Sequence, residues 1–175
     1  MDPVLREQFI ANAENLHTPI GPRTALLLSP KVGTALNAVS TALGANSELA
    51  QDLYELTILM VAREWDSQFE WWVHGPQAEK AGVPADAVEA IRVDKIPKFT
   101  KPAEEATYFY LRELLSPAHK VSDANYARLL GIIGPKQLVE LNVLAGYYGT
   151  VAMNLVAHNV PLRAGIKPPL PPRRR

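Results

Sequence analysis

The sequence predicts an all-α fold, a helical bundle of about seven or eight helices. Wherever the chain shows a pattern, apolar side chains recur at intervals of three and four residues, which is the period of a helix. No stretch shows a convincing strand pattern. Apolar residues make up 47% of the 175 positions, which is enough for a real core in one domain or in two small ones.

The first third of the chain is predicted to contain two helices separated by a loop. Residues 3–16 form a short amphipathic helix, and residues 18–30, with three prolines and a glycine, are typical of a loop with an apolar turn inside it. Proline favours the first position of a helix, so the next helix is expected to begin at Pro30 and to run to residue 45.

The centre of the chain is predicted to form an α-hairpin of two helices, over residues 48–65 and 67–81. Ser47 is expected to cap the first of them, which is apolar over most of its surface and therefore belongs at the centre of a bundle or at a subunit contact. Pro76 lacks a backbone donor, so a kink or break is expected just before it. Gly82 is expected to end the second helix.

Four further helices are predicted in the second half of the chain, over residues 84–93, 103–116, 123–133 and 136–158. Ser122 is expected to cap the third of these helices. Gly134 and Pro135 interrupt the helical pattern before the last one. His158 lies at the end of the last helix, where a cationic imidazole is favourable, and capping is the preferred interpretation of this residue.

The composition argues against several kinds of partner. Eighteen basic and eighteen acidic residues cancel, so net charge gives no support for binding to nucleic acid or to a membrane surface. The longest apolar run, near LNVLAGYYGTVAMNLVA, is interrupted by two glycines and is typical of a buried helix rather than a membrane span. The N-terminus lacks a basic start followed by an apolar core, so no secretory signal is expected and a cytoplasmic, soluble protein is predicted.

Two kinds of chemistry have no support in the sequence. The chain contains no cysteine, which excludes disulfides, thiolate catalysis and cysteine-ligated metal. It also contains neither a phosphate-cradling glycine loop nor a dinucleotide fingerprint, so no cofactor is implied.

The densest group of proton-handling and aromatic side chains lies in the segment EWDSQFEWWVHGP. Ser67, Glu70 and His74 are spaced by three and four, so they form a polar stripe on one face of a helix. Trp71 and Trp72 flank this stripe, and they are expected to form the walls of a cavity that excludes water.

Glu55 lies in the apolar helix that precedes this stripe, where a buried carboxylate is costly unless it has a partner. In an antiparallel hairpin, a rise of about 1.5 Å per residue would place Glu55 and His74 within roughly one turn of each other along the axis. A Glu–His cluster, or a Glu–Glu–His cluster that includes Glu70, can result.

Such a cluster suits general acid–base catalysis. Histidine titrates near neutrality, and a neighbouring glutamate fixes its tautomer and stabilises the imidazolium. A second carboxylate in apolar surroundings has a raised pKa and can hold a proton at neutral pH. Two other interpretations stay open. Glu70 and His74 could form an ordinary pair on the helix surface, or they could bind a metal together with Glu55. A single histidine four residues after a glutamate is not specific to metal sites.

Two further residues are candidates for binding a substrate. Arg63 falls eight residues after Glu55, on roughly the same face, and could hold a substrate carboxylate or form a structural ion pair. Tyr147 and Tyr148 are expected to pack as core or interface aromatics, with one hydroxyl able to reach a cavity, and Tyr147 is the candidate for substrate binding.

Two long segments of the chain resemble the carboxymuconolactone decarboxylase family, which is part of the alkylhydroperoxidase D-like superfamily. They are ELTILMVAREWDSQFEWWVHGPQAEKAGV and LVELNVLAGYYGTVAMNLVAHNVPL, and the resemblance covers roughly residues 19–162. It implies an alkylhydroperoxidase D-like helical bundle that assembles as a homo-oligomer, commonly a trimer or hexamer, with each active site near a subunit contact. Residues 1–18 are then an N-terminal helix or arm, and residues 163–175 a Pro/Arg-rich tail, expected to be extended and solvated.

The resemblance also implies roles for the clustered residues. The peroxidase branch of the superfamily has a motif made of a glutamate, a Cys-x-x-Cys pair and a histidine. In this chain the glutamate falls on Glu55, the two cysteines fall on Ser67 and Glu70, and the histidine falls on His74. Since both cysteines are absent, that branch's thiol chemistry is excluded. The resemblance therefore implies the branch that lacks the pair and uses the histidine as a proton carrier.

The function expected from these observations is a carboxy-lyase, a cofactor-independent decarboxylase of a small oxygenated organic acid or lactone. His74 is expected to carry the proton, Glu55 to orient it and Glu70 to act as a second acid or base. The candidates for substrate binding are Arg63, Ser67, Trp71, Trp72 and Tyr147. The alternatives are hydrolysis, dehydration or isomerisation at the same site, or a non-catalytic oligomeric module.

Overall fold

The computed structural model describes residues 21–26 and 28–173 of the chain. Every regular element in this part is a helix, and none of the described residues lies in a strand, so the all-α prediction is confirmed there. The helices are α2 (Pro22–Leu26), α3 (Pro30–Asn46), α4 (Gln51–Glu64), α5 (Gln68–Ala81), α6 (Ala85–Arg92), α7 (Pro102–Leu114) and α8 (Asp123–Ala157). The expected N-terminal arm, residues 1–18, lies outside the described residues.

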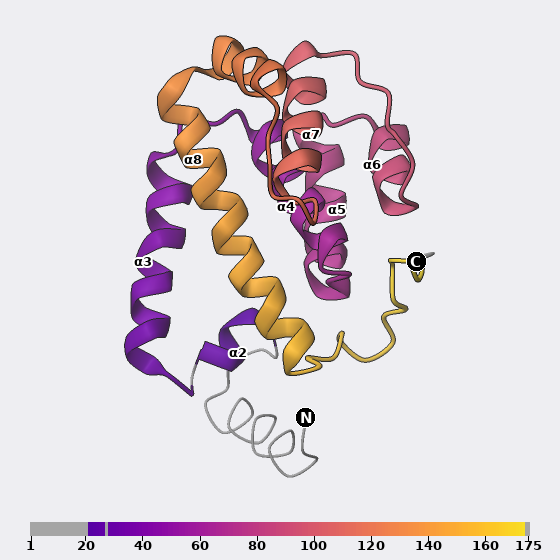
Figure 1. Ribbon diagram of the computed structural model, residues 1–175. Coiled ribbons are helices and arrows are strands. Elements are labelled where there is room, and N and C mark those ends of the chain that lie inside the picture. Colours follow the sequence, from indigo (N-terminus) through magenta and orange to yellow (C-terminus); the bar gives the residue numbers. More distant parts are fainter. Residues whose placement is uncertain (1–20, 27, 174–175) are drawn as a thin grey trace.

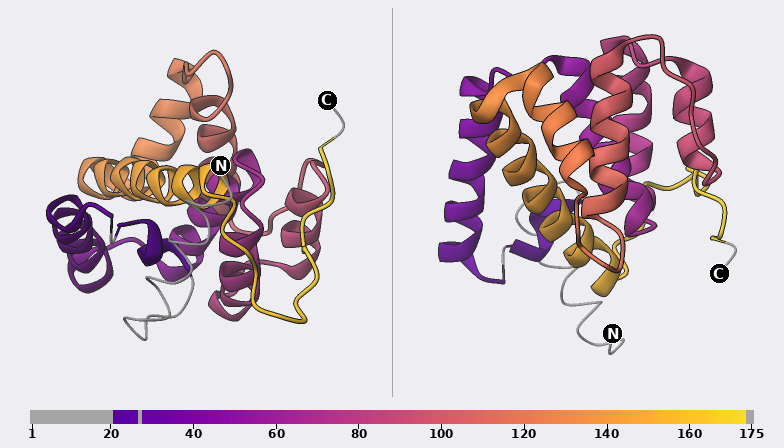
Figure 2. Two further views of the ribbon diagram at one scale, coloured as in Figure 1. Left: turned by 90° about the horizontal axis from the view of Figure 1, so that it is seen from below. Right: turned by 45° about the horizontal axis from the view of Figure 1, so that its top comes forward.

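Helix α4 occupies the centre of the molecule, as the sequence predicts. It contacts α5, α6, α7 and α8, and α3 lies along α8 (Figure 1). Two further views show α3 and α6 on opposite sides of this centre (Figure 2). Leu56, Ile58 and Leu59 on α4 are completely buried, because a helix that is apolar on most faces is stable only when neighbours cover all of them.

Two apolar clusters share α4. One includes Leu111 of α7 and Leu141 of α8, and the other includes Leu56 of α4, Trp71 of α5 and Ile91 of α6. Helix α4 is therefore fixed on both sides, and a residue on it is held in a defined position relative to α5.

The start of α4 differs from the prediction. The helix begins at Gln51, and no side chain caps it. The Ser47 hydroxyl donates instead to Glu140 Oε2 at 3.0 Å, and the same oxygen accepts from the backbone N–H of Glu48 at 3.0 Å. Glu140 of α8 thus holds the α3–α4 connection, while the Ser47 oxygen accepts from the backbone N–H of Leu49 at 3.2 Å, before the helix begins.

The predicted break before Pro76 does not occur, since α5 is helical from Gln68 to Ala81. A proline disfavours helical backbone at the residue before it mainly through that residue's Cβ. Here the preceding residue is Gly75, which has no Cβ. Gly82 ends the helix in the left-handed conformation, with a φ of 102°, as predicted.

The predicted division between the last two helices is present inside α8. Ser122 caps the helix by accepting from the backbone N–H of Asn125 at 3.3 Å. The backbone is non-helical at Gly134, where φ is 79°, a value that favours glycine. His158 is the C-terminal cap residue, as expected.

The Pro/Arg-rich tail is not solvated throughout, which corrects the expectation. Leu170 is 4% exposed and belongs to the apolar cluster of α4, α5 and α6. Gln68 holds its backbone from both sides, by donating to the Leu170 carbonyl at 3.2 Å and accepting from its N–H at 2.8 Å. Arg92 donates to the carbonyl of Pro169 at 2.8 Å. The buried Leu170 side chain and these three hydrogen bonds together hold the segment against the fold.

Replacement of Leu170 by alanine is expected to lower the free energy of unfolding by about 2 kcal/mol, because the buried side chain leaves a cavity at the surface of the core. Urea unfolding followed by circular dichroism measures this. Ile166→Ala, in the exposed part of the same segment, is the matched control and should change stability little. Equal stability of the two variants would contradict the docking of this segment.

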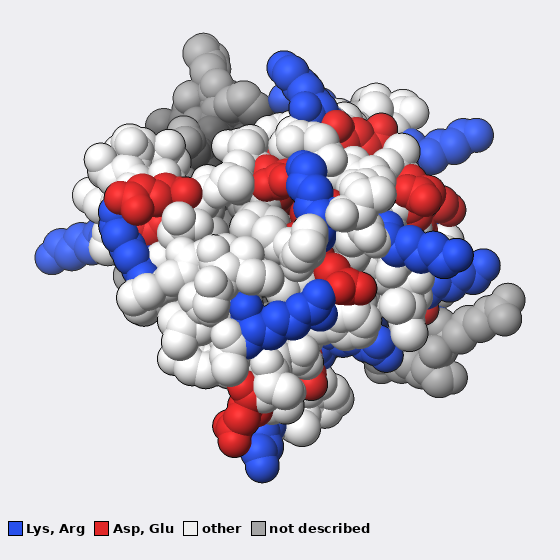
Figure 3. Space-filling view, turned by 90° about the horizontal axis from the view of Figure 1, so that it is seen from above, with Lys and Arg blue, Asp and Glu red and all other residues white. Residues whose placement is uncertain are grey.

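One face of the molecule carries charges of both signs (Figure 3). Acidic and basic side chains are intermingled on the face shown in Figure 3. In the part of the chain that the structure describes, no helix combines the length and the apolar character that crossing a bilayer requires.

Candidate active site

The α4–α5 hairpin brings two glutamates and a histidine together. His74 Nδ1 lies 2.8 Å from Glu55 Oε2, and His74 Nε2 lies 3.4 Å from Glu70 Oε2. The proximity of Glu55 and His74 expected from the hairpin is therefore confirmed, and each ring nitrogen faces a carboxylate. We refer to Glu55, His74 and Glu70 as the Glu–His–Glu cluster.

Burial makes the interactions within the cluster strong. The exposed fraction of the side chain is 3% for Glu55, 4% for Glu70 and 12% for His74. Little water screens charges in such surroundings, so each charged group interacts strongly with its neighbours. The small exposure of His74 leaves the imidazole within reach of a ligand.

Glu55 orients the histidine ring. Its second oxygen, Oε1, accepts from Gln51 Nε2 at 3.0 Å, so both carboxylate oxygens are engaged. A carboxylate oxygen accepts hydrogen bonds, so the bond to Glu55 Oε2 selects the tautomer of His74 that carries its N–H at Nδ1. Nε2 is then the nitrogen that can take up or release a proton on the side of Glu70.

Glu70 is a buried carboxyl group with a shifted pKa. Burial raises its pKa to about 7, and the nearby His74 opposes this rise. Its Oε1 is buried and has no hydrogen-bond partner among the described residues. Glu70 therefore holds a proton for roughly half the time at neutral pH and can act as an acid or as a base.

A cavity of about 200 Å³ lies beside His74 and Glu70. Phe69 and Val73 of α5 and Tyr147, Tyr148 and Val151 of α8 line one part of it; α2 and α3 line the rest. Its size suits a small ligand, since it lies below the range usual for drug-sized molecules. Tyr147 thus reaches the cavity, as the sequence analysis allowed.

Tyr148, the second of the two adjacent tyrosines, is also a neighbour of the cluster. Its ring meets that of His74 edge to face, with centroids 5.2 Å apart. Burial, followed by the nearby Tyr54 and the two glutamates, raises the pKa of Tyr148, so its phenol stays neutral. Gln51 was missed by the sequence analysis, although it lies one helical turn before Glu55, and this spacing was a usable signal.

Two aromatic candidates do not line the cavity. Trp71 is 4% exposed and packs in the core with α4 and α6. Trp72 meets Phe69 edge to face and lies under the guanidinium of Arg163, 5.4 Å from its ring centroid. The expectation of a cavity walled by indole rings is wrong for the described residues, because consecutive helical residues point about 100° apart. Phenylalanine and tyrosine rings take that place.

Two polar candidates also lie elsewhere. Ser67 precedes α5, is 1% exposed and does not line the cavity. Arg63 is 3% exposed and forms ion pairs with Asp66 at 2.8 Å and with Asp94 at 2.7 Å. It also donates to the Pro171 carbonyl at 3.1 Å. Arg63 therefore has the structural ion-pair role that was one of its two interpretations.

The arrangement of the cluster does not favour a metal. The two carboxylates lie at opposite nitrogens of one imidazole, so the three side chains do not converge on a common point. No group of three or more potential ligands within the described ranges could hold an ion.

Comparison of the sequence with models of protein families finds no matching family, and comparison with curated proteins finds no match.

Proposed function

We propose that this protein is a carboxymuconolactone decarboxylase-like enzyme, a carboxy-lyase that removes carbon dioxide from a small oxygenated organic acid or lactone without a cofactor. The observation that carries the proposal is the Glu–His–Glu cluster: a buried imidazole with a carboxylate at each nitrogen, one of them with a pKa of about 7, beside a cavity. Buried titratable groups of this kind are concentrated at catalytic sites.

The chemistry of decarboxylation needs one well-placed proton. The bond between the carboxylate carbon and its neighbour breaks, the electron pair stays on the neighbour, and carbon dioxide leaves. The neighbouring carbon then takes a proton. In this proposal His74 delivers it from Nε2, Glu55 stabilises the positive charge of the ring through Nδ1, and Glu70 supplies the proton that recharges His74. Glu70 then takes up one proton from solvent, so each turnover consumes one proton and restores the cluster.

The surroundings of the cluster support this chemistry. Phe69, Val73 and Val151 give the cavity apolar walls, and the loss of water strengthens the interactions of the charges that line it. The Tyr147 hydroxyl can donate to an oxygen of the substrate. Arg63 is occupied by Asp66 and Asp94, so we do not assign it to the substrate.

The resemblance to the carboxymuconolactone decarboxylase family supports the same assignment, and the absence of cysteine excludes a thiol peroxidase. We also propose a homo-oligomer, a trimer or hexamer, acting in the cytoplasm. Val139, Val143, Met153 and Val156 on α8 are between 45% and 62% exposed, and such an apolar surface is typical of a subunit contact.

The test is to incubate the protein with a panel of lactones and β-keto acids and to measure released carbon dioxide together with loss of substrate. We expect carbon dioxide in a one-to-one ratio with the substrate consumed. Substrate loss without carbon dioxide would reject decarboxylation and favour hydrolysis, dehydration or isomerisation at the same cluster. No turnover across the panel, with intact oligomers, would favour a non-catalytic module.

A further inference from the structure

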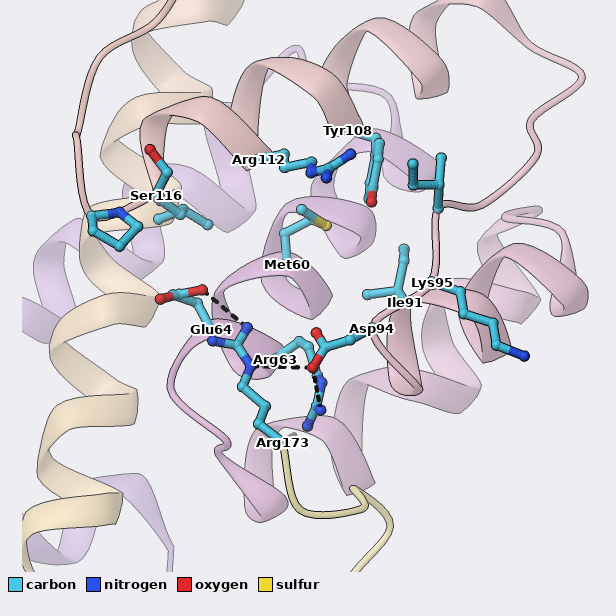
Figure 4. Close-up of a pocket in the computed structure, with 13 residues that line it drawn as sticks. Met60, Arg63, Glu64, Ile91, Asp94, Lys95, Tyr108, Arg112, Ser116 and Arg173 are labelled. Carbon is cyan, nitrogen blue, oxygen red and sulfur yellow. Dashed lines mark hydrogen bonds and ion pairs between the residues drawn. The ribbon is translucent and has the colours of Figure 1, made fainter. Parts of the chain in front are cut away.

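A second cavity lies away from the Glu–His–Glu cluster, and no residue of the cluster lines it. Its volume is about 310 Å³, and its walls come from α4, α7, the α6–α7 connection and the C-terminal segment. Figure 4 shows Met60 of α4 with Tyr108 of α7 and Ile91 of α6 to its right. The floor is therefore apolar.

The rim of this cavity carries four cationic side chains, and two of them are already neutralised. Arg63 pairs with Asp94 and Asp66, and Arg173 pairs with Glu64 at 3.0 Å and with Asp94 at 3.5 Å (Figure 4). These carboxylates are thus fully engaged by the two arginines on the C-terminal side of the cavity.

The other two cations, Arg112 and Lys95, have no ion pair with a carboxylate in the described part of the chain. Figure 4 shows Arg112 extending along α7 toward Tyr108. Both side chains line the cavity. Burial raises the pKa of Tyr108, and the positive charge of Arg112 opposes this rise. The phenol stays protonated and can donate a hydrogen bond.

We propose that this cavity binds a small organic carboxylate with a flat apolar body. The carboxylate would lie against the planar guanidinium of Arg112, which matches its geometry with two parallel donors. Lys95 would add a second positive charge at the rim, and Tyr108 a neutral donor. The apolar body would rest on Met60 and Ile91. An inorganic anion has no apolar surface and would gain nothing from this contact.

This binding site is separate from the proposed catalytic one. Its lining shares no residue with the cavity beside His74. The test of this binding site is therefore independent of whether the protein is a decarboxylase.

The test is isothermal titration of the protein with benzoate, with benzamide as the neutral analogue and inorganic phosphate as the anion without an apolar body. We expect one benzoate per chain and no measurable binding of benzamide or phosphate at the same concentration. Arg112→Gln should raise the dissociation constant for benzoate at least tenfold. Since Arg112 is exposed, circular dichroism should show an unchanged fold.

Two variants serve as controls. Arg128→Gln removes the same charge from an exposed arginine of α8 that pairs with Glu105 and does not line the cavity, and it should leave benzoate affinity unchanged. His74→Gln should also leave it unchanged. The proposal is overturned if Arg112→Gln binds like wild type, if benzamide or phosphate binds as well as benzoate, or if only His74→Gln abolishes binding.

Discussion

Replacement of His74 by glutamine is expected to lower turnover by a factor of about 10²–10⁴, which is the usual contribution of a general acid or base. Glutamine can still donate to Glu55 Oε2, so the buried carboxylate keeps a partner and the hairpin keeps its packing. It cannot take up a proton, so the transfer step alone is removed. Steady-state rates on any substrate found in the panel measure the effect.

The matched control is His119→Gln. His119 is an exposed histidine that does not line the cavity beside the cluster. It should keep wild-type turnover. A His74→Gln enzyme within about twofold of wild type would exclude the histidine as the proton carrier, whatever the reaction is.

Replacement of Glu70 by glutamine is expected to change how stability depends on pH. The folded protein holds the Glu70 proton more tightly than the unfolded chain does, since burial raises its pKa from 4.5 to about 7. The stability that this group contributes is therefore fully present below pH 4.5 and is lost as the pH rises through about 7. Glutamine carries no such proton, so this loss is absent from the variant.

The free energy of unfolding of Glu70→Gln, relative to wild type, should thus rise by about 3 kcal/mol between pH 4.5 and pH 8, at about 1.4 kcal/mol for each unit of pKa. Urea unfolding at a series of pH values measures this difference. Glu79→Gln, on the exposed face of the same helix, should show no such trend. A constant difference between Glu70→Gln and wild type would mean that Glu70 is ionised in the fold as in the unfolded chain.

The part of the site that could be predicted from the sequence depends on local geometry. Glu55 and His74 are only 19 residues apart and lie on two helices joined by a short turn, so helix length alone determined their proximity. The apolar character of α4 also predicted its central position. Both conclusions needed no knowledge of contacts between distant segments.

The features that could not be predicted depend on contacts distant in sequence. Ser47 was expected to cap α4, but the helix begins at Gln51, and Ser47 donates to Glu140, 93 residues away. Arg63 was a candidate for substrate binding, but Asp94 and the Pro171 carbonyl hold it, and nothing near Arg63 in the sequence indicates either partner. The tail was expected to be solvated because its own sequence does not indicate the apolar site that the folded core offers to Leu170.

The account depends on a carboxyl group that holds its proton at neutral pH inside a buried Glu–His–Glu cluster. The most direct test is an NMR titration of protein carrying ¹³C-labelled glutamate carboxyl groups, for wild type and Glu70→Gln. We expect one carboxyl signal with a midpoint of about 7, absent from the variant. If every glutamate in wild type titrates near the ordinary value of about 4.3, Glu70 has no proton to give and the proposed mechanism is wrong.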